Sequence, residues 1–355
     1  MAEETKINNN DAEDCPASDR DILENEIFKL GEGLIDILLA DRSSGKNIIW
    51  ATDSYVSKGA GFGVRDTMTV STVTDANGLV IQPRVDKSAE EQRARSVDKA
   101  EVFTPSWICN KQNNLIDAAW FGNPNSPFNF ELDTPQGNGL LWQTRRQKIR
   151  FSNKKGTSWQ RYVKAPRMEI TCGEGPYLVS RYDTVSGKLI NDPYDRIGLL
   201  DRKLRVVSEN CVTAQDWLTW ADFALKSVYG YEYQGDSLLI ARENILWSMK
   251  DWYLSRHFPE PLTIETYRSW AEIISWNIWQ MDGLKYVVPY SCRDDVEEIP
   301  NLFGTPERRV LPCPGCEKNN PMKHNGVRCK IMDWETGKPV LFLPPFTFEP
   351  IKETC

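Results

Sequence analysis

The stretch Met168–Tyr177, which reads Met-Glu-Ile-Thr-Cys-Gly-Glu-Gly-Pro-Tyr, decides the fold that we expect for this chain. Glu169 lies at the end of a predicted β-strand, and Leu178–Tyr182 would open a helix. Between them, Gly173 and Gly175 lack a Cβ, so the backbone can turn sharply there and approach a ligand. The pattern predicts a nucleotide-binding turn. Taken alone, it also fits an ordinary turn between a strand and a helix.

Three further segments stand in order around this turn. Glu101–Pro105 (Glu-Val-Phe-Thr-Pro) precedes it, and Ile197–Asp201 and Gln234–Leu238 follow it. In this combination the sequence resembles the amino-terminal half of an adenine-N6 DNA methyltransferase of the restriction-modification type. The resemblance covers about residues 95–240. It implies an α/β fold of the S-adenosylmethionine-dependent methyltransferase (Rossmann-like) kind.

The resemblance also implies which residues bind S-adenosylmethionine. They are Phe103, Thr104, Pro105, Glu169, Cys172, Gly173, Gly175, Asp201 and Asp236. Asp201 is the best single candidate, because it ends a predicted second strand, Ile197–Leu200, where an acid can accept hydrogen bonds from a ribose. In the family, the Gly-Asp position of Asp236 lies under the adenine ring. Thr104 and Asp236 are also explained as helix caps.

The catalytic tetrapeptide of the family is Asn or Asp followed by Pro-Pro and an aromatic residue, and it is absent from the expected place. Its carbonyl groups orient the target amine, and its aromatic ring stacks on the flipped base. Asn191–Tyr194 is a near match on the wrong side of the predicted second strand, and Leu343–Phe346 offers Leu where an acceptor is needed. The catalytic residues are therefore unknown. The resemblance implies that a second protein subunit supplies the catalytic loop and the target-recognition domain.

Charge limits how this chain can contact DNA. Its net charge is −7, so it cannot coat DNA by charge alone, since phosphate binding requires neutralising cations. The segment 145–167 is the exception, with nine Lys or Arg residues, no acid, and interleaved aromatic side chains. This segment is a candidate phosphate-contacting face. A solvated basic surface beside acidic segments explains it equally well.

The carboxyl-terminal part carries a predicted zinc site. A Cys-x-x-Cys pair with Pro-Gly inside it turns tightly enough to place two thiolates on one ion. Five candidate ligands are present: Cys292, Cys313, Cys316, His324 and Cys329. A tetrahedral structural site needs four ligands, so we expect either Cys292 or His324 to be a bystander. A redox-active or metal-free thiol pair is the alternative.

The remaining sequence predicts the domain organisation. Residues 1–20 read as a disordered tail, and 21–100 as an extension with a long helix to about Ala40 and a hairpin in 66–84. Residues 101–285 form the predicted cofactor-binding domain, with a tryptophan-rich helical core, and 286–355 form the zinc-binding subdomain. Because no run of 18 or more apolar residues and no signal-peptide pattern occurs, we expect a cytoplasmic protein.

These observations lead to one functional hypothesis and two alternatives. The chain is expected to be the cofactor-binding (modification) subunit of a DNA adenine-N6 methyltransferase, with DNA and a second subunit as partners and S-adenosylmethionine and zinc as cofactors. The first alternative is a non-catalytic DNA-binding or scaffolding protein on a degenerate methyltransferase fold. The second is a complete methyltransferase with an unorthodox catalytic loop.

Overall fold

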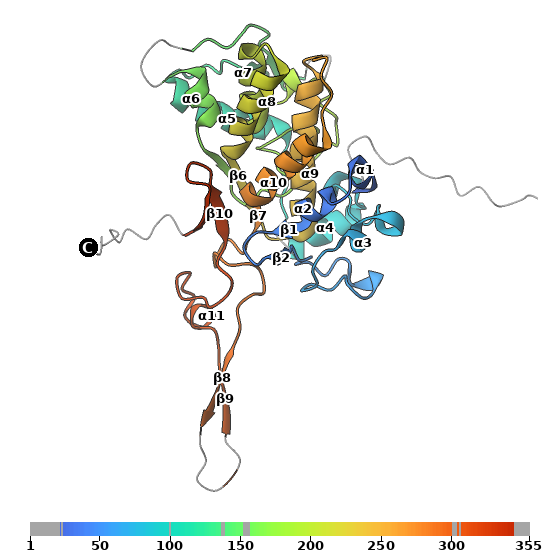
Figure 1. Cartoon of the computed structure of the whole chain (residues 1–355), viewed down its shortest axis with the longest axis vertical. Coiled ribbons are helices and arrows are strands. Elements are labelled where there is room, and N and C mark those ends of the chain that lie inside the picture. Colours follow the sequence, from blue (N-terminus) through green and yellow to red (C-terminus); the bar gives the residue numbers. More distant parts are fainter. Residues whose placement is uncertain are drawn as a thin grey trace, which may run out of the picture.

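The computed structural model describes residues 22, 24–98, 101–135, 139–151, 157–299, 304 and 307–343. The predicted disordered tail, residues 1–20, lies outside these ranges, as do Pro344, Pro345 and Phe346 of the Leu343–Phe346 near match. The described chain has an α/β structure with a parallel sheet (Figure 1). Among its described helices, none combines the length and the apolarity that crossing a membrane would require.

The sheet has three parallel strands in the order β5-β6-β7. They are β5 (Arg167–Glu169), β6 (Val228–Glu232) and β7 (Ile278–Gln280). Arg167 pairs with Val228, and Gly230 of the central strand pairs with Ile278. Parallel neighbours need a long crossover, and two helices fill each crossover here.

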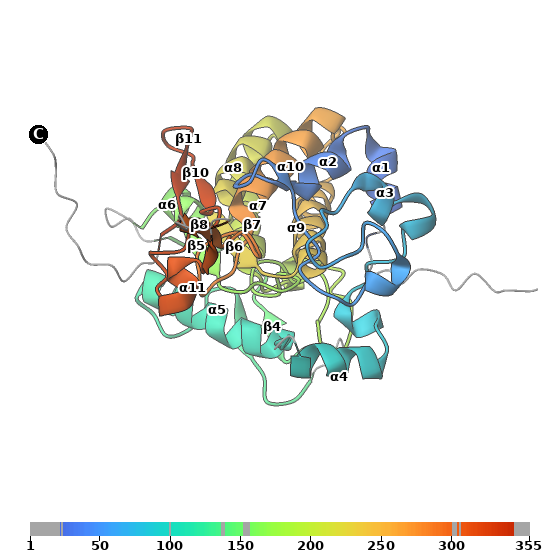
Figure 2. The same ribbon diagram turned by 90° about the horizontal axis from the view of Figure 1, so that it is seen from below.

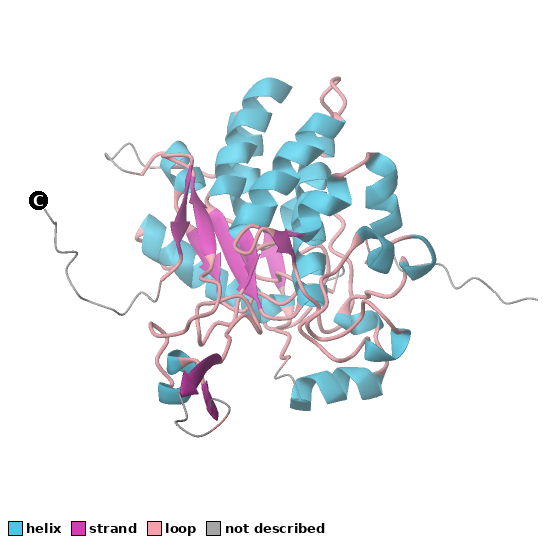
Figure 3. Ribbon diagram, turned by 60° about the horizontal axis from the view of Figure 1, so that its bottom comes forward, coloured by secondary structure: helices cyan, strands magenta, loops and turns pink. Residues whose placement is uncertain are grey.

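The crossover helices pack together as a layer against the strands (Figure 3). β5 is joined to β6 by α7 (Leu199–Asn210) and α8 (Ala214–Lys226), and β6 to β7 by α9 (Gly235–Leu254) and α10 (Ile264–Asn277). Thr213 and Thr263 cap α8 and α10 by accepting hydrogen bonds from backbone N–H groups. Trp217, Trp252 and Trp270 are fully buried in this layer, so the prediction that tryptophans form the core is confirmed for them.

The amino-terminal part wraps around the start of α9 with short elements. Its helices are α1 (Glu24–Leu30), α2 (Leu34–Leu39), α3 (Val70–Val73) and α4 (Ala89–Asp98), and β1 (Ala40–Asp41) pairs with β2 (Lys46–Asn47). The next elements are α5 (Ser106–Phe121), the pair β3 (Asn129–Glu131) and β4 (Trp142–Thr144), and α6 (Trp159–Lys164). The single long helix predicted up to Ala40 is divided between α1 and α2 by Gly31–Gly33, where Gly33 has a φ of 80°.

Two predicted elements of this half are wrong. The Thr/Val-rich segment 66–84 forms no hairpin: Thr69 and Thr72 make a capping box around α3. Threonine side chains that bond to nearby backbone compete with a strand ladder. Leu178–Tyr182 is loop, although a helix was predicted there. A long connection therefore joins the glycine turn to α7.

The carboxyl-terminal part extends away from the sheet and then returns to it. β8 (Asp295–Ile299) and β9 (Glu307–Leu311) form an antiparallel arm that projects from the body in Figure 1. After α11 (Pro314–Lys318), β10 (Lys330–Asp333) and β11 (Lys338–Leu341) pair as a second hairpin. Ile331 and Phe342 pack against Tyr231 and Trp279, so this hairpin covers one face of the sheet over β6 and β7.

Candidate functional site

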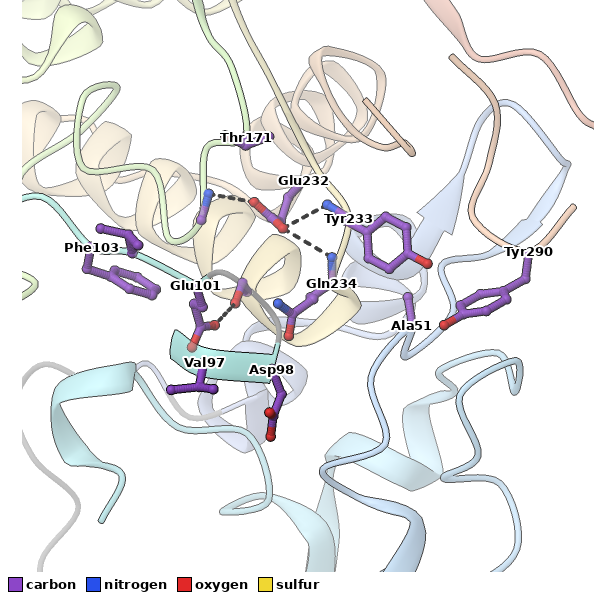
Figure 4. A pocket seen from close by; sticks show the side chains of 13 residues that line it. Ala51, Val97, Asp98, Glu101, Phe103, Thr171, Glu232, Tyr233, Gln234 and Tyr290 are labelled. Atoms are coloured by element: carbon purple, nitrogen blue, oxygen red, sulfur yellow. Dashed lines mark hydrogen bonds between the residues drawn. The ribbon is translucent and has the colours of Figure 1, made fainter. Parts of the chain in front are cut away.

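A cavity of about 620 Å³ lies at the carboxyl ends of β5 and β6 (Figure 4). Its size is typical of small-molecule sites. Residues from distant parts of the chain line it: Ala51, Val97, Asp98, Glu101, Val102, Phe103, Thr171, Gly173, Glu232, Tyr233, Gln234, Ser237 and Tyr290. Open parallel sheets bind ligands outside the carboxyl ends of their strands. The cavity therefore occupies the position where this architecture binds ligands.

Thr171 and Gly173 of the glycine turn after β5 form one wall of the cavity, whereas Gly175, also predicted to bind the cofactor, is not among its lining residues. Gly173 and Gly175 have φ angles of 52° and 80°, in the left-handed region that favours glycine. The N–H of Gly175 donates to the carbonyl of Cys172 at 2.7 Å, which closes the turn. The predicted sharp turn is thus confirmed.

Glu232, the last residue of β6, links the glycine turn to the end of that strand. Its Oε2 accepts from the N–H of Gly173 at 2.8 Å, and its Oε1 accepts from the N–H groups of Tyr233 at 2.8 Å and Gln234 at 3.2 Å. Burial raises the pKa of this carboxyl, and the three N–H groups oppose that shift. Two strand ends and the start of α9 therefore converge on one carboxylate that lines the cavity.

The charged side chains that line the cavity are all acidic among the described residues. Three carboxylates line it, those of Asp98, Glu101 and Glu232, and no lysine or arginine is among the described lining residues. Glu101 is paired with Arg95, whose guanidinium is buried behind the wall at 2.8 Å from both carboxylate oxygens. Asp98 and Glu232 have no cationic partner among the described residues. Such a lining favours a cationic ligand and disfavours an anionic one.

The other residues predicted from the glycine turn and from the Phe-Thr-Pro motif divide between the cavity and its surroundings. Phe103 lines the cavity, and its ring lies 5.1 Å from the guanidinium of Arg84. Thr104 instead offers its carbonyl to the Thr184 hydroxyl, and it does not cap a helix as the alternative had predicted: α5 follows the motif, but Pro105 is its N-cap residue and no side chain caps it. Cys172 and Glu169 are buried beside the turn and do not line the cavity. Burial raises the pKa of Glu169, while the N–H groups of Tyr177 and Leu178 lower it.

Asp201 is not a cavity residue, and the predicted second strand before it is wrong. Gly198 caps α7, so Leu199–Asp201 form its first turn. The Asp201 carboxylate is fully buried and accepts from the N–H of Ser180 and the indole of Trp252, each at 2.9 Å. Burial raises its pKa. It stabilises the loop against the helix layer, and the second strand is β6, which ends in Glu232.

Asp236 is also structural in this fold. It lies in the first turn of α9, fully buried, and its Oδ2 is 2.7 Å from Arg95 and 3.4 Å from Lys87. Tyr55 donates its hydroxyl to the same oxygen at 2.8 Å. Burial alone would raise the pKa of Asp236, but the two cations and the hydrogen bonds lower it well below its usual range. Asp236 thus joins the amino-terminal extension to α9 and does not line the cavity.

Several lining residues had not been predicted from the sequence. Glu232 ends β6, and Tyr233 and Gln234 follow it. An acid at the end of a buried strand was the signal that could have found Glu232. Ala51 comes from a segment without a motif, and Tyr290 lies two residues before Cys292, where only metal ligands had been predicted. The Tyr290 and Tyr233 rings are 6.1 Å apart and form the wall opposite Phe103 (Figure 4).

A separate cluster of Cys292, Cys313, Cys316 and His324 can hold a metal ion such as zinc. The four ligand atoms lie within 4.8 Å of one another. His324 Nδ1 is 3.5, 3.7 and 3.6 Å from the sulfur atoms of Cys292, Cys313 and Cys316. Tetrahedral zinc with ordinary bond lengths requires a sulfur-to-nitrogen separation of about 3.5 Å. The residues therefore fit one tetrahedral ion.

The chain is built to bring these four side chains together. A Cβ at Gly315 would lie 2.4 Å from the backbone nitrogen of His324, so only glycine lets the histidine approach the Cys-x-x-Cys turn. Although burial opposes it, hydrogen bonds from the N–H of Asn325 and from neighbouring groups lower the pKa of Cys313 to about 6. Thiolate is the form that binds metal. Cys292 and Cys313 flank β8 and β9, so an ion here would clamp the base of the projecting arm.

Cys329 does not belong to the cluster, which corrects the expected ligand set. Its thiol is fully buried and donates to the carbonyl of Gln280 at 3.5 Å, among Tyr231, Trp279 and other apolar side chains. Both Cys292 and His324 take part, although one of them was expected to be a bystander. Sequence spacing could not distinguish Cys329 from the true ligands, because it follows His324 closely along the chain.

The described residues of the basic stretch, 145–151 and 157–167, and the Asn191–Tyr194 near match contribute no residue to the cavity, and residues 152–156 lie outside the described ranges. α6 precedes β5, so it lies toward the amino end of that strand, whereas the cavity is at the carboxyl end. Arg146 is paired with Asp192 and Asp195, at 2.7 and 2.8 Å. Asn191–Tyr194 contributes no cavity residue. This part of the basic charge is therefore neutralised internally, and the near match is not placed to meet a ligand in the cavity.

Comparisons of the chain with protein-family models, with curated proteins and with solved structures give no match.

Proposed function

We propose that this chain binds S-adenosylmethionine in the cavity at the carboxyl ends of β5 and β6. The single observation that carries the proposal is the lining of that cavity, which combines three carboxylates with aromatic walls and has no lysine or arginine among its described members. S-adenosylmethionine carries a sulfonium and an ammonium group, so it is attracted to such a lining. A dinucleotide, with its anionic pyrophosphate, is repelled by it.

The geometry supports a specific role for three residues. Glu232 ends the second strand, where an acid accepts hydrogen bonds from a ribose, and it therefore takes the role first expected of Asp201. Gly173 lets the backbone approach the ligand, because a side chain here would be strained at its φ of 52°. Phe103 offers an apolar surface to the adenine or to the methylene groups of the cofactor.

The proposed activity is that of the modification subunit of an adenine-N6 DNA methyltransferase in a restriction-modification system, acting in the cytoplasm. No described cavity residue reproduces the Asn-Pro-Pro-aromatic loop that orients a target amine, so a second subunit would provide this loop and the target-recognition surface. The chain alone would bind DNA weakly, because its net charge is −7 and part of its basic stretch is internally paired.

We further propose that the ion of the Cys/His cluster is zinc with a structural role. Three thiolates and an imidazole match the preferred ligands of structural zinc, and a complete set of four leaves no open position for a substrate. When bound, zinc would hold the base of the arm through Cys292 and Cys313 and fix the chain just after Tyr290.

Transfer of labelled methyl groups to mixed-sequence DNA tests the proposed function. The chain would bind the cofactor but transfer no label alone, and transfer would appear when the second subunit is added. Robust transfer by the chain alone would show that the catalytic loop lies within this sequence. Absence of transfer by the assembled subunits, together with absence of cofactor binding, would refute the proposal.

A further inference from the structure

Strand β5 has one unused hydrogen-bonding edge. It is the terminal strand of the parallel sheet and pairs only with β6 among the described residues (Figure 2). Arg167 donates its N–H to the carbonyl of Ser227, on the β6 side. Because alternate residues of a strand direct their backbone groups to opposite sides, the N–H and C=O of Met168 point away from β6. The N–H of Ile170 likewise has no hydrogen-bond partner among the described residues.

The face beside this edge is bare and apolar. Met168 pairs with Tyr229, and paired residues of neighbouring strands lie on the same face of a sheet. Over β6 and β7 that face is covered by the chain itself, through side chains such as Ile331 and Phe342. Over β5 the cover ends, and Met168 and Ile170 remain 40% and 67% exposed. An uncovered strand edge with exposed apolar side chains is one that proteins ordinarily protect.

We propose that a β-strand from a different polypeptide pairs in parallel with the free edge of β5 and covers Met168 and Ile170. This inference rests on the proposed function, and it identifies where the second subunit binds. The unpaired backbone groups require a strand as the occupant, because only a strand presents donors and acceptors at the matching spacing. The exposed side chains require that the occupant also brings apolar residues.

The position of the cavity explains why a parallel strand would be useful here. Carboxyl ends of parallel strands meet at one edge of a sheet, so the residues that follow the added strand would emerge beside Thr171 and Gly173, at the wall of the cavity. Ligand crevices of open α/β sheets lie where strands on both sides of a central strand diverge. Among the described residues of this chain, β5 has a neighbouring strand on one side only.

Two other occupants fit less well. A second copy that paired through the same edge would be related by a twofold axis, which makes the two β5 strands antiparallel and sends their carboxyl ends in opposite directions. The tail of this chain, residues 344–355, has prolines at 344, 345 and 350, and proline cannot donate to a strand ladder. Both occupants are outcomes of the experiment below.

Hydrogen exchange resolved to single amides, measured on the intact free chain, is the first step of the test. The amides of Met168 and Ile170 should exchange rapidly, while that of Glu169, which faces β6, is protected. Protection of Met168 in the free chain equal to that of Glu169 would mean that the chain covers its own edge, which overturns the proposal.

The second step uses the tagged chain isolated from the cells that encode it. A different polypeptide should co-purify in equal amount, and the Met168 and Ile170 amides should slow about tenfold or more in that complex. The double variant Met168→Lys/Ile170→Lys should lose this polypeptide, whereas Val212→Lys, at a position 84% exposed in another loop, should retain it. Both variants should melt like the unmodified chain, because the substituted side chains are exposed.

Isolation of the chain alone, isolation of a homodimer, or a complex in which Met168 and Ile170 exchange as in the free chain would each overturn the inference. Calorimetry of the free chain with S-adenosylmethionine separates this failure from failure of the proposed function. Cofactor binding without edge protection refutes only the strand pairing, and edge protection without cofactor binding refutes only the proposed cofactor.

Discussion

The cavity and the Cys/His cluster are assembled from the chain in opposite ways. The cluster takes its four ligands from Cys292–His324, and a tight turn and one glycine bring them together. The cavity takes its walls from Ala51 to Tyr290, which become neighbours through the pairing of β5 with β6 and the packing of the amino-terminal part against the start of α9. A site encoded within a short stretch can therefore be predicted from residue spacing, whereas a site assembled from distant segments can be predicted only after the strands are identified correctly.

The largest expected effect concerns the cluster. Cys313→Ala should abolish metal binding, since structural zinc binds with about 10–16 kcal/mol of apparent free energy that requires the full ligand set. Hydrogen exchange should then show lost protection in residues 288–329, while the helix layer stays protected. Metal content is checked by elemental analysis of protein purified without chelator.

Cys329→Ala is the matched control for this variant. Cys329 is buried outside the cluster, so its substitution should leave one metal ion per chain. If Cys329→Ala lost the metal as completely as Cys313→Ala, the ligand set described here would be wrong.

The second largest effect is expected at the buried ion pairs of Asp236, in the first turn of α9. Asp236→Asn leaves Lys87 buried without its counter-charge and leaves Arg95 with Glu101 alone, and breaking a buried pair costs about 3–5 kcal/mol. Urea denaturation should show this loss in the free energy of unfolding. Asp98→Asn is the matched control. Its carboxylate lines the cavity and is exposed, so the substitution should change the free energy of unfolding by no more than about 0.5 kcal/mol. Equal effects of the two substitutions would contradict the structural role of Asp236.

The Asp236 carboxylate also makes the free energy of unfolding depend on pH. Its pKa is depressed in the folded chain, so its contribution to stability is present above the unfolded value of about 4 and is lost as the pH falls toward the folded value. The difference in unfolding free energy between the unmodified chain and Asp236→Asn should therefore be constant near neutral pH and shrink below about pH 4. A difference that grew on acidification would have the wrong sign.

The smallest effect separates the two carboxylates that compete for the ribose role. Glu232→Gln should weaken S-adenosylmethionine binding by about 1–3 kcal/mol, which is roughly 5–150-fold in the dissociation constant. Asp201→Asn should lower the melting temperature and leave the dissociation constant almost unchanged, because Asp201 contacts Ser180 and Trp252 and does not line the cavity. The reverse pattern would restore Asp201 as the cofactor ligand.

The sequence predicted the local features of this molecule well. The glycine turn, the start of a helix after Phe103–Pro105 and the Cys-x-x-Cys turn each depend on residues a few positions apart, and the structure has all three. The burial of Trp252 and Trp270 followed from their apolar neighbours on helices.

What the sequence could not predict depends on long-range packing. Ile197–Leu200 is apolar enough for a buried strand, but Gly198 begins a helix there, so the second strand and its acid were placed 31 residues too early, at Asp201 instead of Glu232. Asp236 looked like a ligand because nothing in the local sequence reveals that Tyr55, Lys87 and Arg95 converge on it. Cys329 was misassigned for the same reason.

Calorimetric titration of the intact, metal-loaded chain with S-adenosylmethionine shows whether the cavity binds this cofactor, and ATP serves as the anionic counterpart that shares its adenosine. A cavity lined by Asp98, Glu101 and Glu232 should bind the cationic ligand at one site per chain and give no heat with ATP. Binding of ATP in preference to S-adenosylmethionine, or no binding of S-adenosylmethionine at all, would contradict the account.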